Sequence, residues 1–229
     1  HELRWLASAT QLRARPPAGL SQGRERGALL LTSAARGNVA ADVPLPALPG
    51  AAREGARVAS VYAERHWRVI GAEHRHDVLA RLAEATVFHF AGHAIENIDR
   101  AERSLLALSD SAGRRTTIEA YDLGRLRLRH LRLVVLSACR TLNTRASRAG
   151  PVTGLAYSFL RAGAGGVVST LWDIDDEPSA SVLIDFHAQQ VRGTSPTASL
   201  RIAQLRALSS QDSRARSPRT WAAFIYTGQ

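Results

Sequence analysis

Short apolar runs of strand length recur along the chain and alternate with segments of helical periodicity. Five runs rich in Leu, Val, Ile and Phe have the character of buried strands: 28–32, 86–91, 133–136, 166–172 and 222–227. Five other segments read as amphipathic helices: 48–64, 76–85, 154–163, 178–191 and 197–208. Strands that alternate with helices predict an α/β fold, with a central mostly parallel sheet and helices on both faces.

Two helix boundaries carry explicit signals. Ser195 is expected to cap the helix that follows, because Pro196 then occupies its first helical position. Gly163 is expected to end the helix before the strand at 166–172. The apolar runs 133–136 and 166–172 lack in/out alternation, as strands buried on both faces do. Ligands of such sheets bind outside the carboxyl ends of the strands, so candidate chemistry is sought there.

Reactive side chains follow two of these strands. His93 ends the stretch VFHFAGH, and Cys139 ends LVVLSAC. If the two strands are neighbours, the imidazole and the thiol come within reach, with Cys139 as nucleophile and His93 as general base. Gly92 fits a tight turn, and the amide groups of Ala94 and Cys139 are candidate oxyanion donors. The alternative is a structural pair, since a lone buried cysteine often packs as a small hydrophobe.

The composition narrows the class of protein. The chain has 229 residues, of which 45% are hydrophobic, so a globular protein is expected. No apolar run is long enough to cross a bilayer. Cys139 is the only cysteine, which excludes an internal disulfide and makes the cytoplasm the default compartment. Methionine is absent even at position 1, so we interpret the chain as an excised or processed piece of a longer protein.

The charge is strongly basic. All 30 Lys and Arg residues are arginine, and the net charge is +10. Nucleic acid is therefore a conceivable partner, and the segment RLRLRHLRL (125–133) could form a basic ribbon. No recognition helix, zinc finger or RNA-binding aromatic motif accompanies these arginines. We interpret them as a solvated surface, and we interpret 125–133 as the approach to a buried strand.

Several ordered motifs resemble the CHAT domain family. They are VFHFAGHA, LVVLSACRT, GPVTGLAYSFLRAGAGGVVSTLWDIDD and the closing WAAFIYTG. The resemblance covers residues 48–229, and residues 1–47 are expected to be the remnant of a domain whose earlier part is missing. Two positions depart from the family pattern, because Ala94 and Leu142 stand where glycine is usual.

The resemblance implies a bacterial cysteine peptidase of caspase-like type. The expected fold is a three-layer sandwich, and His93 and Cys139 match the family's catalytic dyad. Members are often fused to tetratricopeptide repeats, so regulation by a partner or a fused domain is expected. A protein or peptide substrate is implied, with no cofactor. The alternative from a different class is a catalytically silent module that keeps the fold and binds another protein.

An acidic cluster follows the strand at 166–172. Trp172, Asp173, Asp175 and Asp176 are candidates to bind a basic side chain of the substrate. The alternative for Asp175 and Asp176 is helix capping, since a helical segment follows them.

Metal and phosphate sites are not expected. His89 and His93 are four residues apart, but they lie in a strand pattern and lack the glutamate of a zinc-binding helix. His74 and His76 have no neighbouring cysteine. The glycines at 163, 165 and 166 are not followed by the Lys-Ser/Thr pair of a phosphate-binding loop.

Overall fold

The computed structural model describes residues 27–32, 37–38, 44–71, 74–97, 99–109, 115–138 and 154–228. A six-stranded sheet lies at the centre, with the strand order β11–β10–β9–β5–β1–β4. The pairs among β10, β9, β5, β1 and β4 are all parallel, and β11 is antiparallel to β10. The bounds are β1 (Gly27–Thr32), β4 (Arg68–Ile70), β5 (Val87–Ala91), β9 (Leu133–Ser137), β10 (Gly166–Thr170) and β11 (Phe224–Gly228). The predicted mostly parallel sheet is confirmed.

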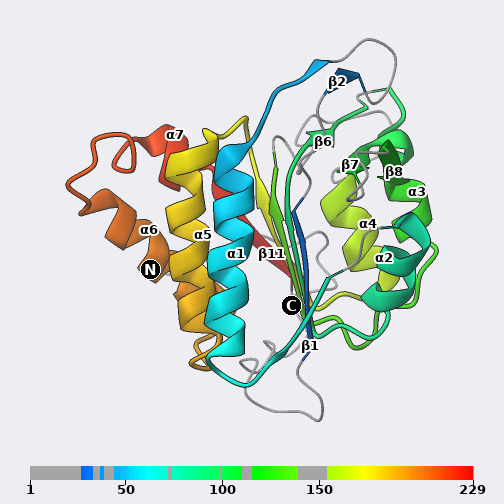
Figure 1. Ribbon diagram of the computed structural model, residues 1–229, viewed down its shortest axis with the longest axis horizontal. Coiled ribbons are helices and arrows are strands. Elements are labelled where there is room, and N and C mark those ends of the chain that lie inside the picture. The colour runs from blue at the N-terminus through cyan, green and yellow to red at the C-terminus, as the bar shows by residue number, and fades with distance from the viewer. Residues whose placement is uncertain are drawn as a thin grey trace.

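Helices cover both faces of this sheet (Figure 1). One layer contains α1 (Pro49–Ala63), α5 (Asp176–Gln190), α6 (Pro196–Leu208) and the short α7 (Pro218–Trp221). The other contains α2 (Arg75–Leu82), α3 (Ala120–Leu123) and α4 (Leu155–Ala162). The central strands separate two hydrophobic cores: Phe88 of β5 packs with α4, whereas its neighbour Val87 packs with α1 and α5. Alternate residues of one strand therefore pack against opposite helical layers, because successive side chains of a strand point to opposite faces.

A smaller antiparallel sheet lies beside the α2–α4 layer. It contains β6 (Ala94–Ile95), β7 (Leu105–Ser109) and β8 (Arg115–Glu119), with a 3-10 turn, η2 (Ala101–Arg103), between β6 and β7. A two-stranded pair, β2 (Gly37–Asn38) and β3 (Pro44–Leu45), precedes α1. Because β6 starts directly after His93, this small sheet fixes the chain that leaves the carboxyl end of β5.

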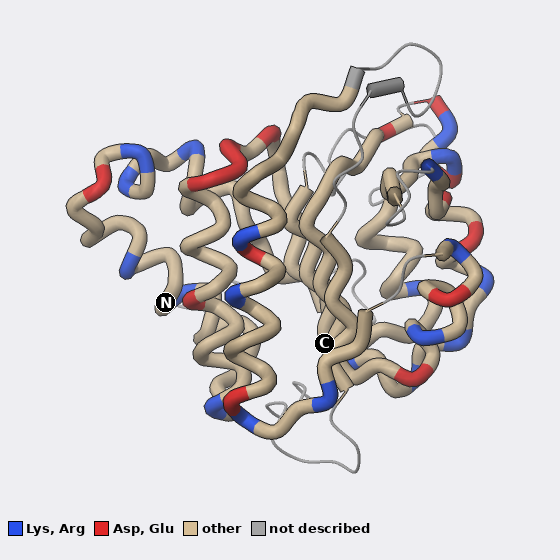
Figure 2. Tube along the Cα trace, in the orientation of Figure 1, with Lys and Arg blue, Asp and Glu red and all other residues tan. Residues whose placement is uncertain are grey.

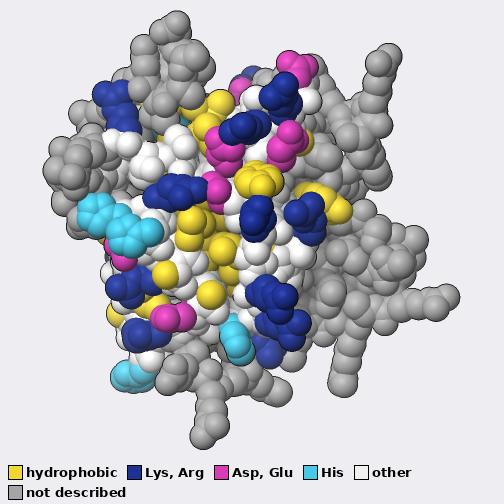
Figure 3. All heavy atoms as spheres, turned by 90° about the vertical axis from the view of Figure 1, so that its right-hand side faces the viewer, with side chains coloured by type: hydrophobic (Ala, Val, Ile, Leu, Met, Phe, Trp, Pro, Cys, Tyr) yellow, Lys and Arg dark blue, Asp and Glu magenta, His cyan; other side chains and the backbone are white. Residues whose placement is uncertain are grey.

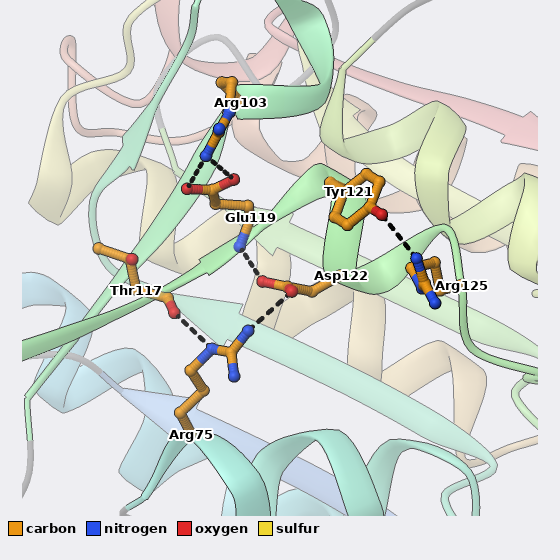
Figure 4. A network of polar contacts seen from close by, with 7 residues as sticks. All are labelled: Arg75, Arg103, Thr117, Glu119, Tyr121, Asp122 and Arg125. Carbon is orange, nitrogen blue, oxygen red and sulfur yellow. Dashed lines mark hydrogen bonds and ion pairs between the residues drawn. The ribbon is translucent and has the colours of Figure 1, made fainter.

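A polar network stabilises the small sheet against its neighbours (Figure 4). Arg75 of α2 pairs with Asp122 of α3 at 2.7 Å and donates to the carbonyl of Thr117 in β8 at 3.1 Å. Glu119 pairs with Arg103 at 3.0 Å, and its amide donates to the Asp122 carboxylate at 3.0 Å. The network connects α2, β8, α3 and η2. Exposed ion pairs contribute little singly, but these share partners and hold the elements in one arrangement.

The long periodic segments were predicted correctly. The five predicted strands correspond to β1, β5, β9, β10 and β11, and the five predicted helices to α1, α2, α4, α5 and α6. Ser195 caps α6 by accepting from the amide of Ala198 at 3.3 Å. Gly163 ends α4 in the left-handed conformation, with φ 106°. The strands and helices that were missed fall into two groups. The short ones, of four residues or fewer, show no period: β2, β3, β4, β6, α3 and α7. The other two, β7 and β8, are as long as β5.

Charged residues concentrate on the outer helices and loops of both layers (Figure 2). In the segment 125–133, Leu128 and Leu131 are buried, while Arg127, Arg129 and Arg132 are exposed ahead of β9. The arginines are therefore exposed ahead of a buried strand, which agrees with a solvated surface and with a basic ribbon alike. A further cluster of arginines, between Arg13 and Arg26, lies outside the described residues. Within the described part of the chain, none of the helices is long and apolar enough to span a bilayer.

Candidate active site

The carboxyl ends of β5 and β9 lie side by side at one edge of the sheet. The two strands pair in parallel with Ala91 opposite Ser137. The pairing extends one residue further, because the amide of Gly92 donates to the carbonyl of Ser137 at 3.1 Å. His93 is the next residue after Gly92. The structure thus places the predicted histidine directly beside the end of the strand that precedes Cys139 in sequence.

Cys139 itself lies outside the described residues, as does Leu142. The last residue described on this segment is Ala138, whose side chain is 2% exposed. Its carbonyl accepts a hydrogen bond from the hydroxyl of Thr170 at 2.5 Å. Thr170 ends β10, the next strand of the sheet. Two neighbouring strands therefore contact the two residues that precede the predicted nucleophile.

The imidazole of His93 is held by a backbone carbonyl. Nε2 lies 2.8 Å from the oxygen of Pro46, in the segment between β3 and α1. A carbonyl only accepts, so this contact requires a proton on Nε2. In the neutral ring, Nδ1 is then the nitrogen that can accept a proton. The side chain is half-buried.

The backbone around Ala94 leaves one amide pointing out of the small sheet. Ala94 lies opposite Leu106 in the antiparallel pair of β6 and β7. The amide of Ala107 donates to the carbonyl of His93 at 2.9 Å, so the adjoining pair is hydrogen-bonded. Bonded and non-bonded pairs alternate along an antiparallel ladder. The N–H of Ala94 therefore points away from β7, although alanine replaces the glycine usual at this position.

The acidic residues after β10 divide into two groups. Asp176 lies in the first turn of α5, and its carboxylate accepts from the amide of Gly50, near the start of α1, at 2.5 Å. Asp175 is the N-cap residue of α5, but its side chain makes no capping hydrogen bond. Asp176 thus interacts with the N-terminal end of a different helix, where a negative charge is favourable. Arg53 and Glu177 form an ion pair beside it.

Trp172 and Asp173 lie nearer to the strand end. Both follow β10, whose carboxyl end is at the same sheet edge as that of β9 because the strands are parallel. The indole nitrogen of Trp172 donates to the carbonyl of Arg219 at 2.9 Å, which fixes the ring next to α7. Asp173 is exposed. These two residues are the members of the cluster nearest in sequence to the carboxyl end of β10.

A buried polar chain beneath the sheet edge was missed by sequence reasoning. Ser137 donates to Oε2 of Glu54 at 2.9 Å, and Oε1 of Glu54 lies 3.3 Å from Nε2 of His89. Nδ1 of His89 lies 3.1 Å from Nε2 of His187, whose Nδ1 lies 2.9 Å from the hydroxyl of Tyr62. Every member is buried. The chain joins α1, β5, β9 and α5 through side chains.

Burial shifts two pKa values in this chain. It raises the pKa of Tyr62, which therefore remains a hydroxyl donor. It lowers the pKa of His187 well below the usual range, and positive charge on His89 lowers that pKa further. His187 is therefore neutral at neutral pH. A neutral imidazole donates from one nitrogen and accepts at the other, so His187 can connect Tyr62 with His89.

The histidines considered for metal binding lie in different places. His89 points into the layer of α1 and α5, where it contacts His187, whereas His93 contacts Pro46 on the loop after β5. His74 and His76 stack on each other at the start of α2, with ring centroids 5.7 Å apart. Within the described ranges, His, Cys, Asp and Glu side chains form no group of three or more suited to a metal ion.

The fold defines the class of protein. A mostly parallel sheet between two helical layers is the arrangement of a caspase-like fold. The structure is similar to gingipain R of Porphyromonas gingivalis, an Arg-specific cysteine proteinase, with a TM-score of 0.60 and 10% identity. That match covers 89% of this chain and 46% of gingipain R.

Two further solved structures share the fold. Separase of Saccharomyces cerevisiae, in complex with securin, matches with a TM-score of 0.54 and 11% identity, over 89% of this chain and 12% of that chain. Caspase-1 of Spodoptera frugiperda matches with a TM-score of 0.52 and 11% identity, over 90% of this chain and 86% of that chain. The chain thus spans under half the length of gingipain R and about an eighth of separase. At these identities the likeness establishes the fold alone.

The sequence comparison identifies the family. The chain belongs to the CHAT domain family, which it matches over residues 1–229. The family resemblance predicted from the motifs is confirmed. No curated protein sequence matches the chain significantly.

Proposed function

We propose that this CHAT domain is a cysteine endopeptidase with Cys139 as nucleophile and His93 as general base and acid. The observation that carries the proposal is the register of β5 and β9, which places His93 beside the strand that leads to Cys139. The contact between Nε2 and Pro46 adds to it. It orients the imidazole so that Nδ1 can receive the thiol proton, just as the third group of a catalytic triad orients its histidine.

The reaction follows from these positions. The proton of the thiol moves to Nδ1 of His93, and the sulfur attacks the carbonyl carbon of the scissile peptide bond. The oxyanion accepts hydrogen bonds from the amides of Ala94 and Cys139. The C–N bond then breaks as His93 returns the proton to the leaving amine, which leaves a thioester. His93 takes a proton from water, the resulting hydroxide attacks the thioester, and the proton passes to the departing sulfur.

A substrate-binding role is proposed for the residues after β10. Trp172 and Asp173 follow the strand next to β9, and Asp175 is exposed nearby, whereas Asp176 already accepts from Gly50. A carboxylate at this place would favour a basic residue before the scissile bond. Peptides with Arg at that position should be cleaved about tenfold faster than peptides with Asp, and Asp173→Asn should remove that difference. Equal or Asp-preferring cleavage by the unaltered protein contradicts the assignment.

The direct test of the dyad is the alkylation rate of Cys139 as a function of pH. Since the chain has one cysteine, intact mass reports this thiol alone. A free thiol has a pKa of about 8.5, so an activated thiol should react at pH 6.5 at least about tenfold faster than a free one. His93→Ala should abolish that excess. The substitution His130→Ala is the matched control, because His130 is exposed at the opposite, amino-terminal side of β9.

Slow alkylation with an ordinary thiol titration, unchanged by His93→Ala, contradicts the peptidase proposal. Faster alkylation on addition of a fused or partner domain would instead support a regulated enzyme, as the family resemblance implies. The measurement therefore also separates an activated dyad from a dyad that needs a regulator.

A second function is favoured by one surface. On the face formed by α2, α3 and α4, arginine side chains surround hydrophobic ones (Figure 3). Tyr121 is 51% exposed and Tyr157 is 38% exposed on α3 and α4. Arg125 lies 5.3 Å from the ring centre of Tyr121. Exposed aromatic residues and arginines are enriched where proteins bind one another, so this face supports the protein-interaction module as the alternative.

A further inference from the structure

Both residues that precede Cys139 are anchored by buried hydrogen bonds. The hydroxyl of Ser137 donates to Glu54 of α1 at 2.9 Å. The carbonyl of Ala138 accepts from Thr170 of β10 at 2.5 Å. One anchor comes from a helix layer and the other from the adjacent strand. Together they act on two consecutive residues, so they restrict both the position and the rotation of the backbone there.

The anchor on Ser137 depends on a close contact between α1 and the sheet. Gly55 follows Glu54 in α1, and a Cβ on Gly55 would lie 2.0 Å from Cγ2 of Thr32 in β1. Glycine therefore allows α1 to lie close to the strands. This closeness lets the short reach of a glutamate side chain extend from α1 to the end of β9.

The carboxylate of Glu54 is placed where a charge is costly. It is 1% exposed, and burial of an ionised carboxylate requires compensating partners. Its hydrogen-bond partner is the Ser137 hydroxyl, and the His89 ring lies 3.3 Å away without the geometry of a hydrogen bond. Behind His89, His187 and Tyr62 complete the chain. An apolar residue would fill this position at lower cost, so the carboxylate is suited to holding Ser137 in one orientation.

We propose that Glu54 and Thr170 are positioning residues for Cys139, acting through Ser137 and Ala138 to set the direction in which the chain leaves β9. The catalytic part of this inference, that Cys139 is positioned for reaction, rests on the proposed function. The structural part, that the two hydrogen bonds order the end of β9, is independent of that function. Neither residue needs to contact a substrate, and neither was a candidate in the sequence, although Thr170 lies within one of the family motifs.

The two anchors can be removed with small changes of shape. Thr170→Val replaces the hydroxyl by a methyl group, and Ser137→Ala deletes the other donor. Each change should slow alkylation of Cys139 at pH 6.5 about fivefold, because the thiol is displaced from His93. Thr170→Ser keeps the hydroxyl and should restore the rate. Glu54→Gln retains an acceptor for Ser137, so it should slow the alkylation of Cys139 less than Glu54→Leu does.

The matched control lies on the same strand. Ser169 precedes Thr170 and is buried, and its hydroxyl has no hydrogen-bond partner within the described residues. Ser169→Ala should leave the alkylation rate unchanged. Urea unfolding of each variant shows that the protein is folded under the conditions of the rate measurement.

Hydrogen exchange gives a readout that does not depend on thiol chemistry. The amide of Gly92 donates to the carbonyl of Ser137, so its protection reports the order at the end of β9. Exchange at Gly92 should be at least about threefold faster in Thr170→Val and Ser137→Ala than in Ser169→Ala. If exchange and alkylation in the two anchor variants both match the control, the proposal is overturned.

The two proposals can fail separately. If His93→Ala slows alkylation while Thr170→Val and Ser137→Ala do not, the dyad stands and the positioning role is refuted. If His93→Ala has no effect but exchange at Gly92 rises in the anchor variants, the ordering of β9 is supported and the peptidase proposal fails.

Discussion

His89→Leu is expected to lower the free energy of unfolding by about 3 kcal/mol, the upper end of the cost of leaving a buried polar group without its partner. The imidazole is fully buried, and its Nε2 is 3.3 Å from the Glu54 carboxylate. Leucine fills much of the volume, but it leaves the carboxylate with the Ser137 hydroxyl as its remaining partner. It also leaves His187 without its contact to His89. The measurement is urea unfolding at pH 7, with circular dichroism as the signal.

A second substitution distinguishes loss of pairing from loss of volume. In Glu54→Leu with His89→Leu, both members of the pair are apolar, so neither leaves the other behind as an unpaired polar group. The double variant should lose less stability than the sum of the two single variants. Additive losses would indicate that the residues contribute by packing alone. A loss below about 1 kcal/mol for His89→Leu would show that the carboxylate finds other partners.

Acidification below pH 6.5 is expected to lower the free energy of unfolding through His187. Burial holds the pKa of His187 in the folded state well below its ordinary value. As the pH falls below 6.5, the unfolded chain binds a proton at this position and the folded protein does not. Stability is therefore intact above the unfolded pKa and decreases by about 1.4 kcal/mol per pH unit until the folded pKa is reached.

The comparison with His187→Gln isolates this contribution. Glutamine can donate and accept in place of the imidazole but does not titrate, so its unfolding free energy should depend less steeply on pH. His130→Gln is the control, because His130 is exposed. Urea midpoints at pH 5, 6 and 7 give the slopes. Parallel curves for the unaltered protein and His187→Gln would contradict the expectation.

Much of the fold was predictable because its main strands are continuous apolar runs and its main helices are long enough to show a period. The strands that became β5, β9 and β10 are continuous apolar runs, and runs of this kind occur where both faces of a strand are covered. Ser195 caps the start of α6 and Gly163 ends α4, as their local sequence predicts. The small sheet was not predictable, because strands such as β6 owe their structure to pairing partners rather than to a period of their own.

The candidate site was predictable only in part. Local sequence placed His93 and Cys139 after two strands, and the register then brought the end of β9 beside His93. The contact with Pro46 had no sequence signal, because any residue offers a backbone carbonyl. Glu54 likewise looked like an ordinary charged residue of an amphipathic helix, since periodicity shows which face a residue occupies but not what lies across from it.

The sequence by itself determined the class of fold, the family and the two residues of the proposed dyad, because these depend on local periodicity and on ordered motifs. Only the tertiary structure decided the partners: that Asp176 interacts with α1, that His89 faces His187, and that Glu54 and Thr170 hold the end of β9. The physical reason is the distance along the chain over which each kind of interaction acts. Periods and caps act within a few residues, whereas a buried polar side chain is paired with whatever distant segment the packing of layers brings to it.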